Sequence, residues 1–323
     1  MGKGGYSPGG KRLMLRKRIL AILGALGILW LVGERGKLIQ PSTLKYMQMM
    51  GWRRVLTTFD FVHAYFYARW TNQYIGWSVK YYMPFLGPES KDGRWAPVYH
   101  GKVLPNELAK ALVSVNQDVC LENMEQLIPY PAARDLILQA PLDIVAYECG
   151  CRHSRANPCQ PTQVCMVIGQ PFVDFVLEHN PQSSRRLTQA EALELLQAEH
   201  ERGHLHAAYF KDVMLDRFYA ICNCCKCCCA GIESMMKHGA PMVMSSGYVA
   251  QVDAARCQAC GTCQNACPFE AISVNGAAHV EWEKCMGCGV CEGQCPNDVI
   301  TLVLDERKGQ PLDIRVLAPA GHT

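Results

Sequence analysis

The sequence predicts an α+β protein with a helical N-terminal region, a cysteine-rich middle module and a small C-terminal domain of short strands and helices. Three observations lead to this prediction. A basic and then apolar segment opens the chain, ten cysteines cluster in its middle, and a cysteine motif occurs twice near its end. We expect five segments, with bounds at 1–40, 41–145, 146–248, 249–304 and 305–323.

The composition favours metal binding over a disulfide framework. The nineteen cysteines are odd in number and densely clustered, which argues for metal ligands in a reducing compartment. Charge is distributed unevenly, because residues 1–54 hold eleven Lys or Arg and one acid, whereas residues 249–304 hold six acids and two bases. The first end therefore suits an anionic surface and the second suits a basic redox partner.

Residues 1–40 are interpreted as a membrane-associating segment. Six basic residues precede the apolar run Ile19–Gly33, which has fifteen residues where a spanning helix needs about 20. No small-x-small cleavage site follows the run, which argues against a signal peptide. We expect a helix that lies on or dips into the membrane, or that docks on an integral-membrane partner. The alternatives are a true span and an ordinary buried helix.

Residues 41–145 predict a mostly helical, aromatic-rich region. Residues 52–99 contain fourteen of the chain's 28 aromatic residues, which suits the membrane–water boundary, a protein interface or a helical core. His63 lies among them as a candidate polar group of a quinone pocket, against the alternative of a structural histidine. Pro105 predicts the start of one helix, and two flanking prolines predict another over 132–140. Cys120 is expected to be a buried, inert thiol.

The middle module holds two groups of cysteines, and the first matches the ligand count of one iron–sulfur cubane. Its members are Cys149, Cys151, Cys159 and Cys165. Four thiolates hold a [4Fe-4S] cluster, so we predict one such cluster here. Arg152 would lie beside it and raise its reduction potential through charge and hydrogen bonds. The alternative places Arg152 and His153 in a solvent-facing loop.

The second group exceeds the ligand count of one cubane. Its six members are Cys222, Cys224, Cys225, Cys227, Cys228 and Cys229. Three arrangements are open: a further cubane on four of the six, an unusual cluster that draws thiols from both groups, and free thiols for redox exchange. A helix capped by Thr188 and Glu191 and ended by Gly203 would bring the two groups together. We expect this module to be largely irregular and helical.

The C-terminal motif predicts two [4Fe-4S] clusters. The spacing Cys-x2-Cys-x2-Cys-x3-Cys-Pro starts at Cys257 and recurs 28 residues later at Cys285. Three closely spaced cysteines wrap one face of a cubane, and the fourth ligand comes from the other repeat. One cluster is therefore assigned to Cys257, Cys260, Cys263 and Cys295, and the other to Cys285, Cys288, Cys291 and Cys267.

These motifs resemble the bacterial two-[4Fe-4S] ferredoxins of the clostridial type over residues 249–304. The resemblance implies a ferredoxin-like dicluster domain with two short helices and with strands near 249–252, 271–274, 279–282 and 300–304. Together with the upstream CxCR and CNCCxCCC segments, residues 146–304 resemble bacterial and archaeal 4Fe-4S binding proteins. That wider resemblance implies redox work without a specific substrate.

These features predict a membrane-associated iron–sulfur protein that relays electrons through the two ferredoxin-type clusters and one or more further clusters. No Gly-rich phosphate loop follows a predicted strand, so other redox subunits, such as a flavoprotein or a quinone-reactive membrane protein, are expected as partners. No nucleic-acid-binding pattern occurs. No catalytic residue is assigned, and an electron-transfer subunit is favoured over a stand-alone enzyme. The alternatives are a reductase whose CNCCKCCC cluster contacts substrate and an iron–sulfur sensor or carrier.

The cysteines also bear on the expected location. Basic residues ahead of Ile19–Gly33 favour a cytoplasmic N-terminus. A single span would then place every cysteine outside the cell, whereas iron–sulfur clusters are normally inserted in the cytosol. We therefore expect a membrane-associated protein with its clusters on the cytoplasmic side.

Overall fold

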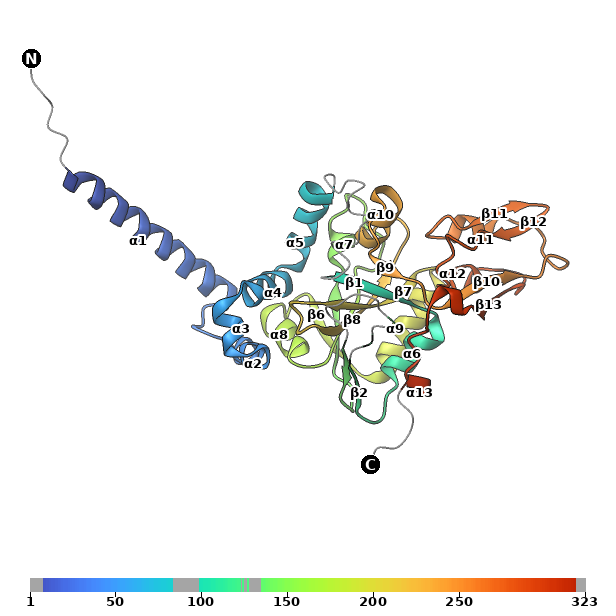
Figure 1. The fold of residues 1–323 in the computed structure, drawn as a ribbon, viewed down its shortest axis with the longest axis horizontal. Helices are drawn as coiled ribbons and strands as arrows, with labels where there is room; N and C mark the ends of the chain where they lie inside the picture. The colour runs from blue at the N-terminus through green and yellow to red at the C-terminus, as the bar shows by residue number, and fades with distance from the viewer. Residues whose placement is uncertain (1–7, 84–98, 123, 125–126, 128–134, 318–323) are drawn as a thin grey trace, which may run out of the picture.

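The computed structural model describes residues 8–83, 99–122, 124, 127 and 135–317, with the side chains of the first helix from residue 18 onward. Helices and strands are mixed, which confirms the prediction of a protein that contains both (Figure 1). A helical N-terminal part leads into a seven-stranded sheet, and a smaller domain with two two-stranded sheets follows.

The N-terminal part consists of short helices behind one long helix. In the described residues 8–83 these are α1 (Pro8–Gly33), α2 (Pro41–Met50), α3 (Trp52–Thr57), α4 (Asp60–Arg69), α5 (Thr71–Trp77) and the π-helical segment η1 (Ser78–Tyr82). Aromatic side chains of α4 are buried, among them Phe61, Tyr65 and Tyr67, whereas Trp52 and Trp77 are exposed. Some aromatic rings of this region therefore belong to the hydrophobic core, whereas others are exposed to solvent.

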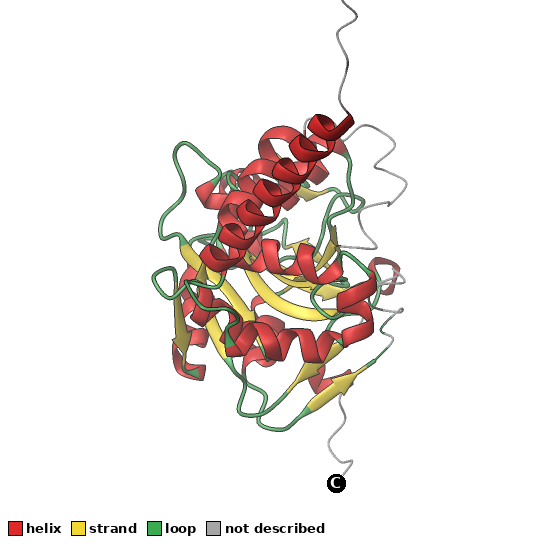
Figure 2. Cartoon of the chain, turned by 90° about the vertical axis from the view of Figure 1, so that its left-hand side faces the viewer, coloured by secondary structure: helices red, strands yellow, loops and turns green. Residues whose placement is uncertain are grey.

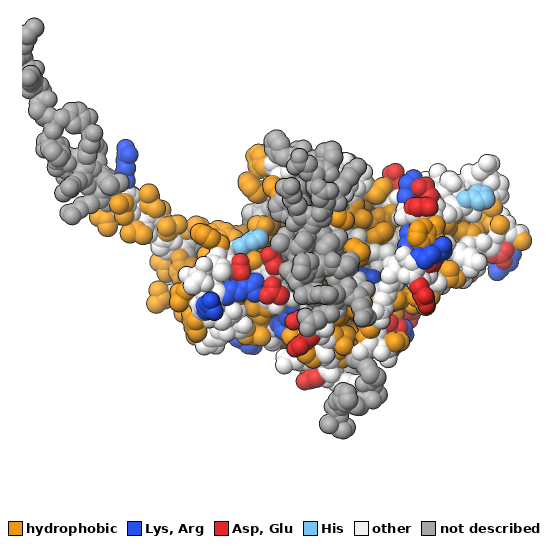
Figure 3. All heavy atoms as spheres, in the orientation of Figure 1, with side chains coloured by type: hydrophobic (Ala, Val, Ile, Leu, Met, Phe, Trp, Pro, Cys, Tyr) orange, Lys and Arg blue, Asp and Glu red, His pale blue; other side chains and the backbone are white. Residues whose placement is uncertain are grey.

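Helix α1 projects away from the rest of the molecule and is held near its C-terminal end (Figures 1 and 2). The Trp30 ring stacks on Tyr65 at a centroid distance of 5.2 Å, and its Nε1 donates to the Leu38 carbonyl at 2.7 Å. Along the described part of the helix, the other large apolar side chains are exposed (Figure 3). These are Ile19, Leu20, Ile22, Leu23, Leu26, Ile28, Leu29, Leu31 and Val32. Among the described residues, no helix has both the length and the apolar character required to cross a membrane.

A buried carboxylate fixes the end of α1 to the body. Glu34 is fully buried, and its Oε atoms accept hydrogen bonds from the Gln40 backbone N–H and, at 2.9 Å, from Thr43 Oγ1. His179 Nε2 lies 3.2 Å from Glu34 Oε1 and belongs to α8 (Phe172–His179). A buried charge needs such partners to offset its desolvation, so these contacts join α1, α2 and α8.

The sheet contains seven strands, each antiparallel to its neighbours except for one parallel pair at the edge. Their order is β6 (Ser184–Leu187), β4 (Ile144–Glu148), β5 (Gln163–Ile168), β8 (Arg217–Cys224), β7 (Leu205–Lys211), β1 (Tyr99–Leu104) and β9 (Val243–Met244), with β1 and β9 parallel. The expectation of a largely irregular and helical middle module is therefore wrong. The strand-forming aromatic and β-branched residues of β8 outweigh the ambiguous cysteines at its end.

Helices cover both faces of the sheet. On one face α6 (Asn106–Val113) and α9 (Gln189–Glu201) pack against side chains such as Met166 and Ile221. On the other face α4 and α8 pack against side chains such as Val167 and Tyr219. The structure confirms the capping box of α9, with its Thr188 and Glu191. Helix α6 is also present, but it begins at Asn106, and Pro105 is its N-cap rather than its first helical residue.

Two local expectations between these helices are wrong. Residues 136–138 form strand β3 (Leu136–Leu138), paired with β2 (Val119–Leu121), where a helix over 132–140 was expected. Alternate residues of β3 are buried, which is a strand pattern, and residues 132–134 lie outside the described residues. Cys120 is exposed on β2 rather than buried, because it points away from the core that its strand neighbours enter.

The C-terminal domain has the expected two strand pairs and two short helices. Its elements are β10 (Tyr248–Val252) with β13 (Ile300–Leu304), β11 (Ile272–Asn275) with β12 (Ala277–Val280), α11 (Thr262–Ala266) and α12 (Val290–Gly293). The tail then forms a 3-10 turn, η4 (Glu306–Lys308), and α13 (Ile314–Leu317). Leu312 and Ile314 of the tail are buried in the same core as α6.

Gly287 is predicted to exclude any side chain. Its backbone has a φ of 61°, and a Cβ there would collide with the Tyr248 carbonyl oxygen and with Ser246 Oγ. We expect Gly287→Ala to lower the free energy of unfolding by about 3 kcal/mol, since the collision adds to the left-handed strain. Anaerobic denaturant unfolding, followed by cluster absorbance, measures this change.

The matched control is Gly261→Ala. Gly261 also has a positive φ, 80°, but no atom lies within 4 Å of its built Cβ. Its substitution should cost only the backbone strain, about 1–2 kcal/mol. Equal losses for the two variants would contradict the proposed collision.

Candidate metal centres

The ferredoxin-type cysteines surround two separate small cavities. The first cavity is lined by Cys257, Cys260, Cys263 and Cys295, and the second by Cys267, Cys285, Cys288 and Cys291. Each cavity measures about 10 Å³. The structure therefore brings together each of the two sets of four that the doubled spacing predicts, including the fourth cysteine from the other repeat.

Backbone groups and burial suit these thiols to hold metal. The N–H of Ala278 donates to Cys257 Sγ at 3.4 Å, and that of Ala271 donates to Cys267 Sγ at 3.3 Å. Such bonds stabilise sulfur ligands and tune cluster potentials. Burial raises the pKa of Cys288 to about 12, so at neutral pH this thiol keeps its proton until a metal displaces it. Four-thiolate iron–sulfur clusters fit both sets of residues.

Six of the ten middle cysteines form a closed ring, in which each thiol lies beside two others that influence its pKa. In order around the six-thiol ring they are Cys149, Cys151, Cys229, Cys224, Cys222 and Cys165. The ring lines a cavity of about 260 Å³. The ring draws on both sequence groups, so the structure brings together thiols that are far apart in the sequence.

Regular secondary structure places the ring members. Cys222 and Cys224 are two residues apart on β8, so their side chains share one face of the sheet. Cys165 lies on the neighbouring strand β5, beside Cys222. The remaining members adjoin the short helix α7 (Gly150–His153) and α10 (Ala230–His238). In a helix Cys222 and Cys224 would point to different faces, whereas the strand places both on one face.

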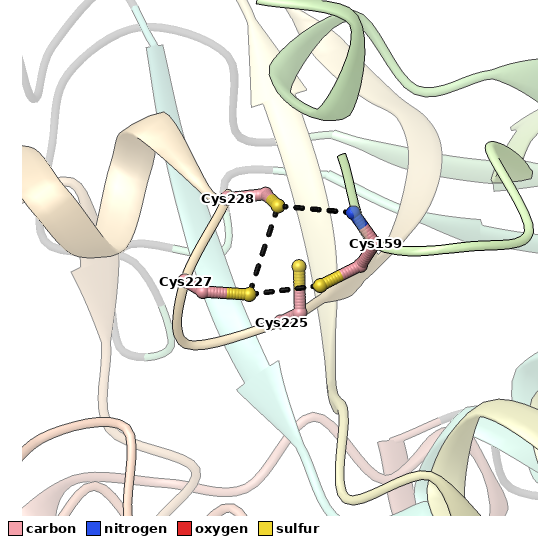
Figure 4. Close-up of side chains that lie close together, drawn as sticks. All are labelled: Cys159, Cys225, Cys227 and Cys228. Atoms are coloured by element: carbon pink, nitrogen blue, oxygen red, sulfur yellow. Dashed lines mark hydrogen bonds between the residues drawn. The ribbon is translucent and has the colours of Figure 1, made fainter. Parts of the chain in front are cut away.

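The other four middle cysteines form a compact group, here called the tetrad (Figure 4). It consists of Cys159, Cys225, Cys227 and Cys228, whose sulfurs all lie within 4.8 Å of one another. Cys159 Sγ is 2.8 Å from Cys227 Sγ, and Cys227 Sγ is 3.6 Å from Cys228 Sγ. The predicted set Cys149, Cys151, Cys159 and Cys165 is thus divided, with three members in the ring and Cys159 in the tetrad.

Arg152 is buried beside both groups rather than exposed in a loop. Its Nη2 donates to Glu199 Oε2 of α9 at 2.8 Å and to the Asn223 carbonyl at 3.4 Å, between two ring cysteines. Burial alone would raise the pKa of Glu199, but hydrogen bonds from His204 and Arg152 lower it. His153, by contrast, is exposed, and its Nε2 lies 2.7 Å from Glu148 Oε2.

Aromatic residues form much of the remaining wall of the 260 Å³ cavity. Two polar pairs interrupt this wall: Tyr67 Oη and Tyr219 Oη at 2.6 Å, and His63 Nε2 and Tyr74 Oη at 2.8 Å. Helix α5 lies close over the ring, because a Cβ at Gly150 would meet the Ile75 side chain at 2.8 Å. The cavity therefore joins six thiols to an aromatic surface with a few hydrogen-bonding groups.

Two family models match the C-terminal part of the chain. Residues 250–273 match the 4Fe-4S binding domain, and residues 262–305 match the LdpA Fe-S cluster-binding domain. The C-terminal part is an iron–sulfur domain. It holds at least one [4Fe-4S] cluster, which makes the chain an iron–sulfur electron-transfer or cluster-binding protein. No match was found among curated proteins or solved structures.

Proposed function

We propose that this chain is an electron-transfer protein in which two ferredoxin-type [4Fe-4S] sites supply electrons to a polynuclear iron–sulfur cofactor on the six-thiol ring. The closed ring beside the 260 Å³ cavity carries the proposal. A cubane takes four thiolates, and six suit a larger cluster. The ring cavity is also far larger than the cavities of about 10 Å³ at the ferredoxin sites.

Contacts between the ferredoxin domain and the sheet support a path between these centres. Gln294, next to Cys295, donates from Nε2 to the Glu201 carbonyl at 2.9 Å. Lys226 Nζ lies 3.4 Å from the Asn265 carbonyl, which it reaches from among the middle cysteines. Both contacts lie within two residues of a cysteine of a proposed site, so they keep the ferredoxin domain close to the middle module.

The iron content tests this function. We expect the anaerobically reconstituted chain to hold about eight irons in the ferredoxin sites and additional iron on the ring. Cys222→Ser with Cys224→Ser should remove the ring iron and leave the ferredoxin electron paramagnetic resonance (EPR) signals. Cys120→Ser, at an exposed thiol outside both groups, is the control. About eight irons or fewer in the reconstituted wild type contradicts the proposal, because the two ferredoxin sites alone account for eight.

A second candidate function is reduction of a small substrate inside the cavity. The aromatic wall and its two polar pairs favour it, because ligand cavities combine apolar surface with a few hydrogen-bonding groups. Electrons delivered to the ring would then reach a molecule bound against Tyr67 and His63. In this version the chain is a reductase, and the ferredoxin domain is its internal electron supply.

Cyanide distinguishes the second candidate from a pure relay. An iron with an open coordination position facing the cavity should bind cyanide, and the EPR spectrum attributed to the ring should shift. Cys222→Ser with Cys224→Ser should abolish that shift while the ferredoxin signals stay unchanged. A spectrum that cyanide leaves unaltered in the wild type argues for the relay alone.

We propose further that α1 attaches the protein to the cytoplasmic face of a membrane, beside a redox partner in that membrane. Support comes from its exposed apolar side chains and from the basic residues that precede them. An apolar helix that projects into solvent exposes surface that lipid or a partner would bury. The acidic ferredoxin domain suits a basic redox partner.

Vesicle flotation tests the membrane attachment. Leu20→Glu, Leu23→Glu and Leu26→Glu combined should weaken binding to vesicles rich in phosphatidylglycerol by at least about tenfold, since three exposed leucines lose their burial in lipid. Val316→Glu, at an exposed apolar position in the tail, is the control and should bind as the wild type does. Equal flotation of the triple variant and the wild type contradicts attachment through α1.

A further inference from the structure

The four thiols of the tetrad are packed more closely than a cubane allows. A single tetrahedral ion with metal–sulfur bonds of about 2.3 Å holds its sulfurs about 3.8 Å apart. The tetrad sulfurs all lie within 4.8 Å of one another, and two of their separations are 2.8 and 3.6 Å. In a cubane, four irons and four sulfides separate the cysteine sulfurs further. Among the described residues, the ring and ferredoxin cysteines form no group this compact.

The local fold holds the four thiols together without help from the ring. Cys225, Cys227 and Cys228 lie on the turn after β8, and Cys159 comes from the loop after α7. Arg155 joins the two segments, because its Nε donates to the Cys228 carbonyl at 3.0 Å and its Nη2 pairs with Glu233. The Cys159 N–H also points to Cys228 Sγ at 3.5 Å. Cys227 is exposed, so an ion can enter from solvent.

We propose that the tetrad binds one thiophilic divalent cation, Zn²⁺ or Fe²⁺, as a tetrahedral four-thiolate site separate from the iron–sulfur clusters. Both ions accept four thiolates in this geometry. The ligands therefore select this class of ion, and the availability of each metal in the cell determines which of the two is bound. Binding replaces four thiol protons by one M²⁺ and leaves a site of net charge −2. Lys226, between Cys225 and Cys227 in the sequence, supplies a positive charge, whereas the charge of Arg155 is paired with that of Glu233.

The ion would fasten the turn that separates the two middle centres. Cys224 and Cys229 flank this turn and belong to the ring, whereas the cysteines between them belong to the tetrad. Lys226 on the same turn contacts Asn265 of the ferredoxin domain. The site would therefore fix the positions of the sheet, α10 and the ferredoxin domain relative to one another. The proposal for this site does not depend on which cofactor the ring carries.

Metal analysis and X-ray absorption of the full chain, purified anaerobically from cells supplied with both metals, test this site. We expect one zinc per chain with four sulfur neighbours at about 2.3 Å and no neighbouring metal atom. If iron occupies the site, oxidation should instead give a mononuclear ferric EPR signal. Absence of zinc together with iron that is entirely polynuclear overturns the proposal.

A double variant locates the ion. Cys159→Ser with Cys227→Ser should remove this one metal equivalent and leave the EPR signals of the ferredoxin sites unchanged. Cys120→Ser, an exposed thiol outside the tetrad, should keep the metal. Retention of the mononuclear metal by the double variant overturns the assignment, whereas loss of ring iron alone bears on the proposed function and not on this site. If the double variant fails to fold, the X-ray absorption spectrum of the wild type still shows whether a mononuclear four-sulfur site is present.

Discussion

The alternation of side chains along β8 is the constraint on which both middle centres depend. It directs Cys222 and Cys224 to the cavity face and Asn223 to the opposite face, where His206 Nδ1 lies 2.5 Å from Asn223 Oδ1. Asn223 Nδ2 also donates to the Val164 carbonyl at 2.6 Å. A shift of the strand by one residue would turn Asn223 toward the cavity and both cysteines toward the opposite face. The buried amide therefore fixes which thiols reach the cavity.

A buried ion pair connects that strand to the rest of the molecule. Arg152 and Glu199 are both fully buried, and the removal of one partner of such a pair typically costs about 3–5 kcal/mol. The pair links α7, which adjoins two ring cysteines, to α9, which contacts the ferredoxin domain through Glu201. The position of the ring and the docking of the ferredoxin domain consequently rest on the same charge pair.

Sequence reasoning succeeded where the determining contacts are local. The capping box at Thr188 and the β11–β12 hairpin are encoded within a few residues, and each ferredoxin repeat carries three cysteines in one short loop. It failed for the middle module because Cys159 and Cys227, 68 residues apart, meet only through the sheet. Cysteine has no decisive secondary-structure preference, so only the aromatic and β-branched residues ahead of Cys222 signalled a strand.

The division of neighbouring cysteines between two centres has a consequence for assembly order. Cys228 and Cys229 are adjacent in the chain, yet one belongs to the tetrad and the other to the ring. In an unfolded chain all six thiols of 222–229 compete for the same incoming metal, and proximity in sequence favours mismatched chelates. In the proposed arrangement, correct loading of the middle module has to follow formation of β8. Each ferredoxin set needs only the two repeats, because three of its cysteines lie in one short loop and the fourth comes from the other repeat.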